Sequence, residues 1–191
     1  MMKLYYGPGA CSFVPHAALE AIRAAVGTGF ETQAVKLHKG EQVTPEYLAL
    51  NPHGQVPLLV EDGKPLTQIV AICDYLDRRF PQAGLMPGGE WERAQALSTL
   101  AWMNNTVHPT FTHVFRPANF AVGEAAQADV RALAVEKFRA HLERIQAMAA
   151  HAAPWLYGDR ISFADFYALV FLRWGGLACI DPASLPGYKA Y

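Results

Sequence analysis

The chain has 191 residues, of which 52% are hydrophobic and 17% are charged. This is the composition of an ordinary folded protein, and it excludes a largely disordered chain. The 16 lysines and arginines nearly balance the 17 aspartates and glutamates. Charge therefore gives no reason to expect a nucleic acid or an anionic membrane as a partner. The length suits one domain or two small ones.

Neither a membrane span nor a secretion signal is predicted. The longest apolar stretch, 166–172, is flanked by Asp165 and Arg173 and falls far short of the roughly 20 residues that a span requires. The N-terminal apolar run is broken at once by Gly7-Pro8-Gly9. The three cysteines, at positions 11, 73 and 179, form neither a disulfide framework nor a metal-ligand spacing. We therefore expect a cytoplasmic protein without a metal site.

The first 80 residues alternate short apolar runs with helical patterns, which predicts a small α/β domain with a mixed sheet. The predicted strands are 3–6, 31–37, 56–60 and 64–66, and the predicted helices are 12–25, 45–50 and 68–79. Asp62-Gly63 between the last two strands is a favoured two-residue hairpin turn.

Prolines and glycines in segment 81–89 predict a linker. Beyond it, apolar residues recur at helical spacing over 90–115, 124–150 and 163–175. We therefore expect one domain over residues 1–80 and an all-helical domain over residues 90–191.

Cys11 lies between a glycine-proline turn and the first predicted helix. Unpaired N–H groups and the helix dipole favour negative charge there, which predicts a lowered pKa for the thiol. The same place suits a small buried core cysteine, or a ligand's thiolate or carboxylate, and position alone does not separate these alternatives. No second cysteine stands three positions on, so any redox chemistry is predicted to use a single thiol.

The patterns of two further motifs indicate structural roles. In NPHGQVPLL, Pro57 cannot donate to a sheet ladder, so it indicates an edge or an irregular junction. Ser162-Phe163-Ala164-Asp165 has the form of a capping box before an apolar helix. We interpret this box as the start of a helix buried at the centre of the second half, without a catalytic role for the aspartate.

His108 lies on one stripe of the predicted helix 90–115, together with Leu97, Ala101, Asn104 and Phe111. A lone histidine on such a stripe is more often a core or interface residue than a functional one. Pro109 removes a backbone donor, which should free the carbonyl of Asn105 and kink the helix beside His108, as happens where a helix borders a cleft.

Together these motifs resemble the glutathione transferases, and most closely their bacterial beta class. The resemblance is carried by the run from Tyr6 to Ser12 with Pro15-His16, by the stretch from Asn51 to Pro57, and by the capping box. It covers nearly the whole chain.

The resemblance implies an α/β plus all-α fold, with a thioredoxin-like N-terminal domain and an all-helical C-terminal domain. It also implies a homodimer that binds glutathione as co-substrate in the first domain, against an open hydrophobic cleft. Catalytic roles are implied for Cys11, which touches the glutathione sulfur and can form a mixed disulfide, for His108, which reaches the thiol, and for Tyr6.

Further residues are implied as ligand contacts. Val56, before a cis-Pro57, pairs with the cysteinyl backbone, while Gln68 and Ile69 bind the γ-glutamyl end. Lys39 is a candidate for the glycyl carboxylate, and Asn105 is a further glutathione contact. The expected cleft residues are generic apolar and stacking groups, namely Phe13, Phe111, Phe115, Arg116 and Trp174.

Three positions depart from the family pattern. Ile69 replaces the usual serine or threonine, and Ala101 stands where beta-class members often carry an asparagine that contacts the neighbouring subunit's glutathione. At about 0.5–1.5 kcal/mol each, two lost hydrogen bonds predict binding weakened several-fold to roughly a hundredfold. The chain also stops at Tyr191, soon after Pro186-Gly187 opens a helix that family members continue, as a truncated chain or one lacking its tail would.

Two classes of function follow. The first is an enzyme that adds the glutathione thiolate to an apolar electrophile, with thiol-disulfide exchange or peroxide reduction through Cys11 as a close variant. The second is a non-catalytic binding protein that keeps the fold but binds glutathione poorly, which Ile69 and Ala101 favour. The cysteine at a helix start and the histidine spaced to meet it favour the enzyme.

Overall fold

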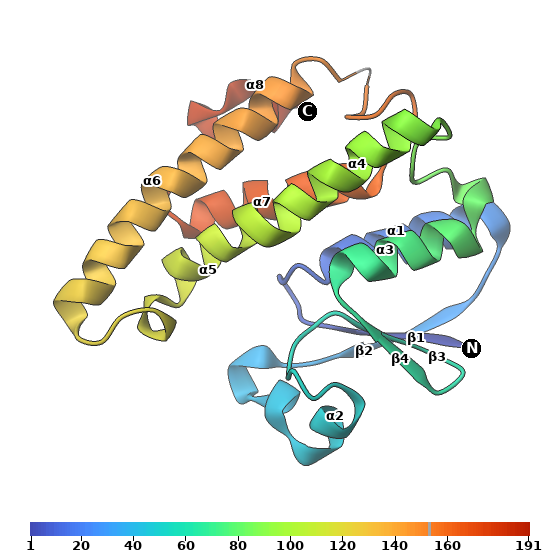
Figure 1. The fold of residues 1–191 in the computed structure, drawn as a ribbon, viewed down its shortest axis with the longest axis horizontal. Coiled ribbons are helices and arrows are strands. Elements are labelled where there is room, and N and C mark those ends of the chain that lie inside the picture. The colour runs from blue at the N-terminus through green and yellow to red at the C-terminus, as the bar shows by residue number, and fades with distance from the viewer. Residues whose placement is uncertain (153) are drawn as a thin grey trace. The chain divides into compact units, whose positions relative to one another are not determined.

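The computed structural model describes residues 1–152 and 154–191. Its internal contacts divide the chain into two units, Met1–Gly88 and Gly89–Tyr191 (Figure 1). The division falls inside segment 81–89, in which Pro81–Ala83 forms a short 3-10 turn. The domain ranges 1–80 and 90–191 stay a prediction, and each unit is described by itself.

The first unit is built on a four-stranded mixed sheet, as predicted. Its strands β1 (Met2–Tyr6), β2 (Phe30–Ala34), β3 (Leu58–Glu61) and β4 (Lys64–Thr67) lie in the order β2-β1-β3-β4, and β1 is parallel to β2 and antiparallel to β3. The helices are α1 (Phe13–Val26), α2 (Pro45–Leu50) and α3 (Ile69–Arg79). Figure 1 shows α1 and α3 together on one side of the sheet and α2 on the other.

Both faces of this sheet are covered where β3 crosses it. Leu58 packs with Val35 and Tyr47, and Tyr47 belongs to α2. The next residue, Leu59, is equally buried and, by the alternation of side chains along a strand, faces the opposite side. The loops that precede α1 and β3 therefore project from a sheet that is buried on both faces at its centre.

The predicted hairpin is confirmed. Asp62 and Gly63 both have positive φ, 49° and 77°, as a type I′ turn requires. Glu61 pairs with Lys64 across the turn, so Val60 and Pro65 form the next, non-hydrogen-bonded pair and the nitrogen of Pro65 is directed away from β3. Since proline has no N–H to offer there, the outer edge of β4 is protected against pairing with another strand.

Two predicted strands are shorter than expected. The strand over 31–37 ends at Ala34, because the N–H of Lys36 donates to the Glu41 carboxylate at 2.7 Å and the chain then enters the 3-10 turn Leu37–Lys39. The strand over 56–60 begins at Leu58, since Pro57 cannot donate to the ladder.

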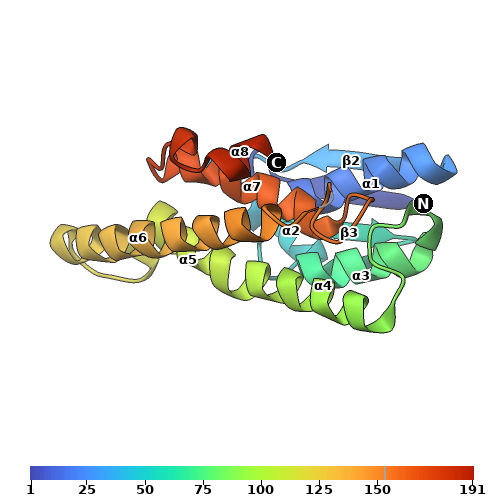
Figure 2. The same cartoon turned by 90° about the horizontal axis from the view of Figure 1, so that it is seen from above.

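The second unit is helical. Its helices are α4 (Glu90–Trp102), α5 (His108–Phe115), α6 (Glu124–Ala149), α7 (Phe163–Leu177) and α8 (Pro186–Ala190). The largely buried α7 packs against α4, α5 and α6, as predicted for the apolar helix after the capping box. Figures 1 and 2 show α8 beside the C-terminal end of α6, with which it is in contact.

The predicted single helix 90–115 is interrupted. Met103–Val107 forms a π-helical turn in which the N–H of His108 donates to the carbonyl of Met103, five residues back. The interruption expected at Pro109 is therefore present, and it takes the form of a wider turn of helix. Such π-turns are frequent at functional sites.

The capping box of α7 is present in full. The Asp165 carboxylate accepts hydrogen bonds from the backbone N–H and the hydroxyl of Ser162, both at 2.6 Å, and from the N–H of Leu156 at 3.0 Å. Burial raises the pKa of Asp165, although the hydrogen bonds from Ser162 and Leu156 oppose that shift. The aspartate therefore starts the central helix and also fixes the loop before it, which confirms the structural interpretation.

Within residues 1–152 and 154–191, no helix combines the length and the apolar character that crossing a membrane demands.

Replacing Asp165 by alanine is expected to lower the free energy of unfolding by about 2–4 kcal/mol, because it removes a cap and leaves the buried N–H of Ser162 without its acceptor. Denaturant unfolding measures the change. The control is Asp159→Ala at an exposed position, expected to stay within about 0.5 kcal/mol of the wild type. Equal losses in the two variants would contradict the assigned role.

Candidate functional site

The loop between β1 and α1 is closed by the buried Ser12. Its hydroxyl accepts a hydrogen bond from the N–H of Gly7 at 3.0 Å and lies 3.2 Å from the carbonyl of Gly7, to which it can donate. A Cβ on Gly7 would lie 2.9 Å from Cδ1 of Leu37, so a larger residue at this position would displace the end of the Leu37 side chain. The loop therefore fixes Cys11 directly before α1.

The loop before β3 is equally well fixed. The carbonyl of Gln55 accepts hydrogen bonds from the Tyr47 hydroxyl at 2.6 Å and from the Asn51 amide at 2.7 Å. Asn51 also accepts from the N–H of His53 at 3.1 Å. The Val56-Pro57 peptide bond is cis, as the resemblance implied.

These two loops meet at Cys11. Its Sγ donates to the carbonyl of Val56 across 3.7 Å, so motifs 45 residues apart in the sequence come together. The thiol is 7% exposed. Of the candidate residues in the first unit, Cys11 and Val56 are the pair that a hydrogen bond joins.

The predicted lowering of the Cys11 pKa is wrong for this structure. Burial raises the pKa of the thiol to about 12, and the backbone N–H groups of Cys11 and Ser12 lower it by less than burial raises it. At such a pKa only about one thiol in 10⁵ is ionised at pH 7. The helix start is present, but desolvation outweighs its effect.

Gln68 and Ile69 occupy the start of α3 in different ways. Gln68 is exposed and has φ 72° and ψ 121°, a strained conformation for a residue with a side chain. Ile69 is buried, so its side chain belongs to the core and only its backbone is available to a ligand. At position 69 this chain therefore buries an apolar side chain where the family pattern has a hydroxyl.

The remaining candidates of the first unit are more peripheral. Lys39 is exposed on the 3-10 turn Leu37–Lys39. Tyr6 ends β1 and packs its ring against His16 at a centroid distance of 4.9 Å. Phe13 is the half-buried first residue of α1.

In the second unit, His108 begins α5 with its Nδ1 2.8 Å from the hydroxyl of Tyr167. Its ring also packs against Trp174 at 5.0 Å. Burial lowers the pKa of His108 to about 4, so the imidazole is neutral at pH 7. Asn105 is exposed and accepts a hydrogen bond from the Thr106 hydroxyl at 2.7 Å.

The stripe predicted for this helix is offset by one residue. The buried positions are Ala96, Leu100, Met103 and Val107, whereas Leu97, Ala101, Asn104 and His108 are half-buried. The last member of the predicted stripe, Phe111, is buried as expected. His108 therefore lies at the edge of the buried face, where its side chain stays partly exposed.

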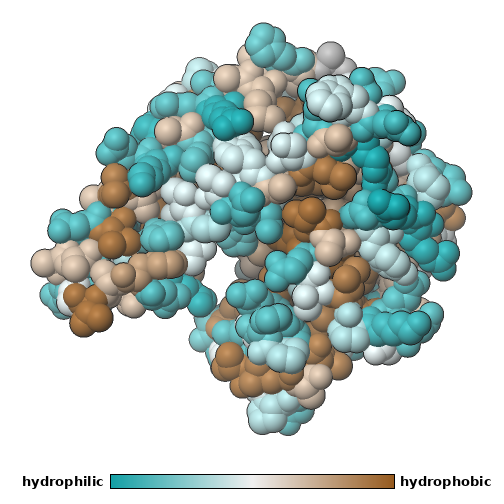
Figure 3. All heavy atoms as spheres, in the orientation of Figure 1, coloured by the Kyte–Doolittle hydropathy of each residue, from teal (hydrophilic) through white to brown (hydrophobic). Residues whose placement is uncertain are grey.

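The expected cleft residues of the second unit differ in exposure. Phe111 and Trp174 are buried and stack on each other at 4.3 Å, so they belong to the aromatic core with Phe138 and Phe171. Phe115 is 61% exposed, and Arg116 is also exposed. Figure 3 shows apolar surface at the end of the unit where α5 connects to α6, a connection in which Val122 is exposed.

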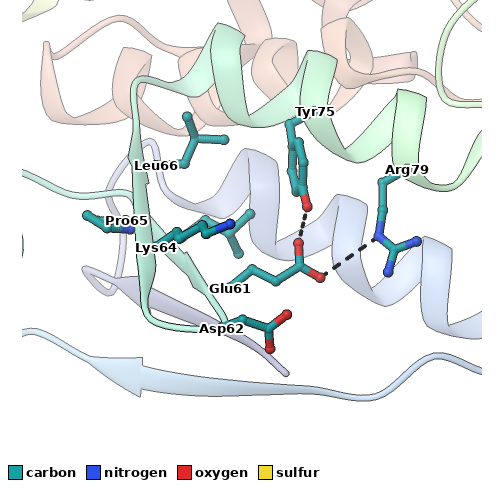
Figure 4. A pocket seen from close by; sticks show the side chains of 8 residues that line it. Glu61, Asp62, Lys64, Pro65, Leu66, Tyr75 and Arg79 are labelled. Carbon is teal, nitrogen blue, oxygen red and sulfur yellow. Dashed lines mark hydrogen bonds and ion pairs between the residues drawn. The ribbon is translucent and has the colours of Figure 1, made fainter.

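A pocket of about 410 Å³ lies elsewhere, between the β3–β4 hairpin and α3. Glu61 points across it toward Tyr75 and Arg79 (Figure 4), accepting a hydrogen bond from the Tyr75 hydroxyl and pairing with Arg79 at 3.9 Å. None of the candidate residues named from the sequence lines this pocket. The Glu61 contacts fasten the hairpin to α3.

The sequence patterns missed several residues that shape the site. Ser12 and Asn51 stand inside the quoted motifs, and a count of loop hydrogen-bond donors could have indicated them. Tyr47 and Tyr167 carry no local signal, because their partners Gln55 and His108 reach them only through folding. Among the described residues, no group of histidine, cysteine, aspartate and glutamate could hold a metal ion.

Comparison with known proteins agrees with this geometry. Residues 1–78 match the family model described as glutathione S-transferase, N-terminal domain, and residues 103–190 match the glutathione S-transferase C-terminal domain. A glutathione S-transferase of Xanthomonas campestris pv. campestris is 34% identical, over 100% of this chain and 90% of its own length.

Solved structures show the same likeness. A glutathione transferase homologue from Sulfitobacter, with bound glutathione, matches 99% of this chain and 89% of its own with a TM-score of 0.89 at 29% identity. A bacterial beta class glutathione S-transferase of Sphingomonas chungbukensis matches 99% and 90% of the two chains with a TM-score of 0.82 at 30% identity.

A two-unit fold with a cysteine at the first helix and a cis-proline loop beside it defines a glutathione-dependent transferase. The chain belongs to the glutathione S-transferase family, whose members are enzymes.

Gln68→Gly is expected to raise the free energy of unfolding by about 1 kcal/mol, because glycine adopts positive φ without the strain that Gln68 bears. The same variant loses the side chain proposed to bind glutathione, so its affinity should fall. Denaturant unfolding and calorimetry measure the two effects. Gln68→Ala is the control, since it removes the side chain but keeps the strain. A glycine variant no more stable than the alanine variant would argue against strain at this position.

Proposed function

We propose that this transferase adds the glutathione thiolate to apolar electrophiles, and that it works as a cytoplasmic homodimer of the beta class. The observation that carries the proposal is the contact of the Cys11 thiol with the Val56 carbonyl, at two loops held rigid by Ser12, Tyr47 and Asn51. Such preorganisation is what a site needs in order to position a reacting sulfur.

The first unit supplies the groups for the tripeptide. The backbone of Val56 pairs with the cysteinyl residue, and the free N–H groups at the start of α3, with the exposed Gln68 beside them, receive the γ-glutamyl carboxylate. Lys39 supplies a positive charge for the glycyl carboxylate, and Asn105 a further amide. The strained backbone of the exposed Gln68, at φ 72° and ψ 121°, supports a binding role for that residue.

The pKa of Cys11 determines its role in this proposal. Because burial raises that pKa to about 12, the thiol stays protonated and acts as a hydrogen-bond donor. Its S–H, which donates to Val56 in this structure, would donate to the glutathione thiolate when the tripeptide is bound. His108, whose pKa burial lowers to about 4, is neutral at pH 7 and can accept a hydrogen bond from the glutathione thiol.

The apolar acceptor is proposed to lie against the exposed aromatic and cationic surface of Phe115 and Arg116, and against Phe13. Phe111 and Trp174 support that surface from the core beneath Phe115, since Phe111 stacks on both of the other rings. Tyr6, packed on His16, directly precedes the Cys11 loop and is a further candidate catalytic group.

Thiol-disulfide exchange is the second candidate. In that reaction the Cys11 thiolate attacks oxidised glutathione, a Cys11–glutathione disulfide forms, and one reduced glutathione leaves. The cysteine at the head of α1 favours it, but the raised pKa of Cys11 makes the attacking thiolate scarce. Conjugation leaves Cys11 unchanged and does not need this thiolate, so the structure favours conjugation.

The cytoplasmic and dimeric parts of the proposal have separate support. The cysteines Cys11, Cys73 and Cys179 are all free thiols, which fits a reducing compartment. Large apolar side chains such as Trp91 and Leu133 are exposed in the second unit, as expected where a second copy binds.

Calorimetry with reduced glutathione, combined with conjugation to chlorodinitrobenzene, tests the main proposal. Cys11→Ala should keep measurable binding and lose about tenfold to a hundredfold in kcat/KM, because one hydrogen bond to a charged sulfur is removed. The matched control is Cys73→Ala, which removes another buried thiol, within α3, and should keep the activity of the wild type. No binding heat and no conjugation by the wild type would refute the proposal.

Intact-mass spectrometry after incubation with oxidised glutathione separates the two reactions. The exposed Cys179 would accept glutathione by itself, so the experiment uses Cys179→Ser as its background. At pH 7 we expect little adduct on Cys11, since its pKa is raised to about 12. A rapid adduct that Cys11→Ala abolishes would favour exchange over conjugation.

A further inference from the structure

The side chains of Tyr47 and Asn51 converge on one backbone carbonyl. Tyr47 lies in α2 and Asn51 caps its C-terminal end, so the two residues are four positions apart and lie on one face of that short helix. The Tyr47 hydroxyl donates to the carbonyl of Gln55 at 2.6 Å, and the Asn51 amide donates to the same oxygen at 2.7 Å. Because a carbonyl oxygen has two lone pairs, these two donors occupy both. The group is called the Gln55 clamp below.

The direction of both hydrogen bonds follows from the groups themselves. A carbonyl oxygen has no hydrogen, so the Tyr47 hydroxyl must be the donor. The Oδ1 atom of Asn51 accepts from the backbone N–H of His53 at 3.1 Å, so the amide nitrogen of Asn51 is the atom that faces Gln55. Tyr47 is 6% exposed and Asn51 is 1% exposed, so water has little access to these bonds.

A carbonyl that is held in place also fixes the N–H of the next residue. Gln55 and Val56 are joined by a planar trans peptide, in which the C=O and the N–H point in opposite directions. The Gln55 clamp holds the C=O on the side of α2, so the N–H of Val56 is directed away from α2. Within residues 1–152 and 154–191, no group accepts a hydrogen bond from this N–H. It is therefore a fixed donor that a ligand can use.

The backbone groups of Val56 face the side on which Cys11 lies. Val56 precedes Pro57, and a residue before proline favours an extended backbone. In an extended backbone the N–H and the C=O of one residue point to the same side. The C=O of Val56 accepts from the Cys11 thiol at 3.7 Å, so the N–H of Val56 is expected on that side as well. Val56 thus offers a donor and an acceptor side by side, which is the pattern that pairs with an extended peptide backbone.

We propose that Tyr47 and Asn51 are positioning residues for glutathione, because their hold on the Gln55 carbonyl directs the N–H of Val56 at a carbonyl of the tripeptide backbone. The statement about the direction of the N–H stands on the geometry of the first unit alone, and the statement about glutathione rests on the proposed function. The two side chains act through the Gln55–Val56 peptide and not by touching the ligand. Such preorganisation lowers the ordering cost of binding, so its loss should appear in the affinity for glutathione.

Nitrogen-15 NMR of the protein without any ligand tests the Gln55 clamp. Tyr47→Phe keeps the ring and removes one donor, so the order parameter of the Val56 amide should fall clearly below the rigid value of about 0.85. Asn51→Ala removes the other donor and should loosen the same amide. Tyr5→Phe is the matched control, since the Tyr5 ring packs against Tyr47 at 5.9 Å but its hydroxyl is not bonded to Gln55. A Val56 amide as rigid in Tyr47→Phe and Asn51→Ala as in the wild type would overturn the proposal.

Calorimetry and kinetics with reduced glutathione test the positioning role. Tyr47→Phe should weaken binding about threefold to tenfold, while kcat at saturating glutathione stays within about twofold of the wild type. Tyr5→Phe should keep the affinity of the wild type. A loosened Val56 amide with unchanged affinity, or a fall in kcat without a fall in affinity, would overturn the positioning role. If the wild type failed to bind glutathione while the Val56 amide loosened in Tyr47→Phe, the proposed function would fail and the Gln55 clamp would stand.

Discussion

Removal from water is the physical constraint on which the chemistry of this protein depends. Burial raises the pKa of the Cys11 thiol to about 12 and lowers the pKa of the His108 imidazole to about 4. Desolvation is the largest cause in both cases, and it favours the neutral form of each group. At pH 7 the protein therefore holds an S–H donor and a neutral imidazole. In the proposed function, such neutral groups suit the stabilisation of a thiolate brought by a ligand better than the formation of one on the protein.

Hydrogen-bonded loops hold these groups in place. Around Cys11, the buried Ser12 closes one loop on Gly7, and Tyr47 and Asn51 hold the carbonyl of Gln55 next to Val56. In the second unit, the π-turn and Tyr167 fix the imidazole in a similar manner. In each place a buried polar side chain binds backbone or ring atoms, so the reacting groups need little reorganisation when a ligand arrives. Gln68 differs from these buried polar residues. Its backbone is strained, and its side chain is exposed, where a ligand can reach it.

Much of the fold could be predicted because its signals are local. The Asp62-Gly63 turn, the Ser162–Asp165 box and the alternation of strand and helix each depend on residues close together in the chain. Element boundaries depend in addition on tertiary hydrogen bonds, which the sequence pattern does not show. The strand expected to reach residue 37 ends at Ala34 because Glu41 captures the N–H of Lys36. The helix expected to be continuous over 90–115 contains a π-turn that periodicity alone does not reveal.

By itself, the sequence determined the family, the order of the secondary-structure elements and the identity of the main site candidates, because motifs record residue types and short spacings. Only the tertiary structure decided their chemical state. The helix start at Cys11 predicts a lowered pKa, yet the pKa is raised, because desolvation depends on every atom that surrounds the sulfur and not on the neighbouring residues in the chain. Likewise His108 was found from its spacing, but the partner of its Nδ1 is the hydroxyl of Tyr167, 59 residues away.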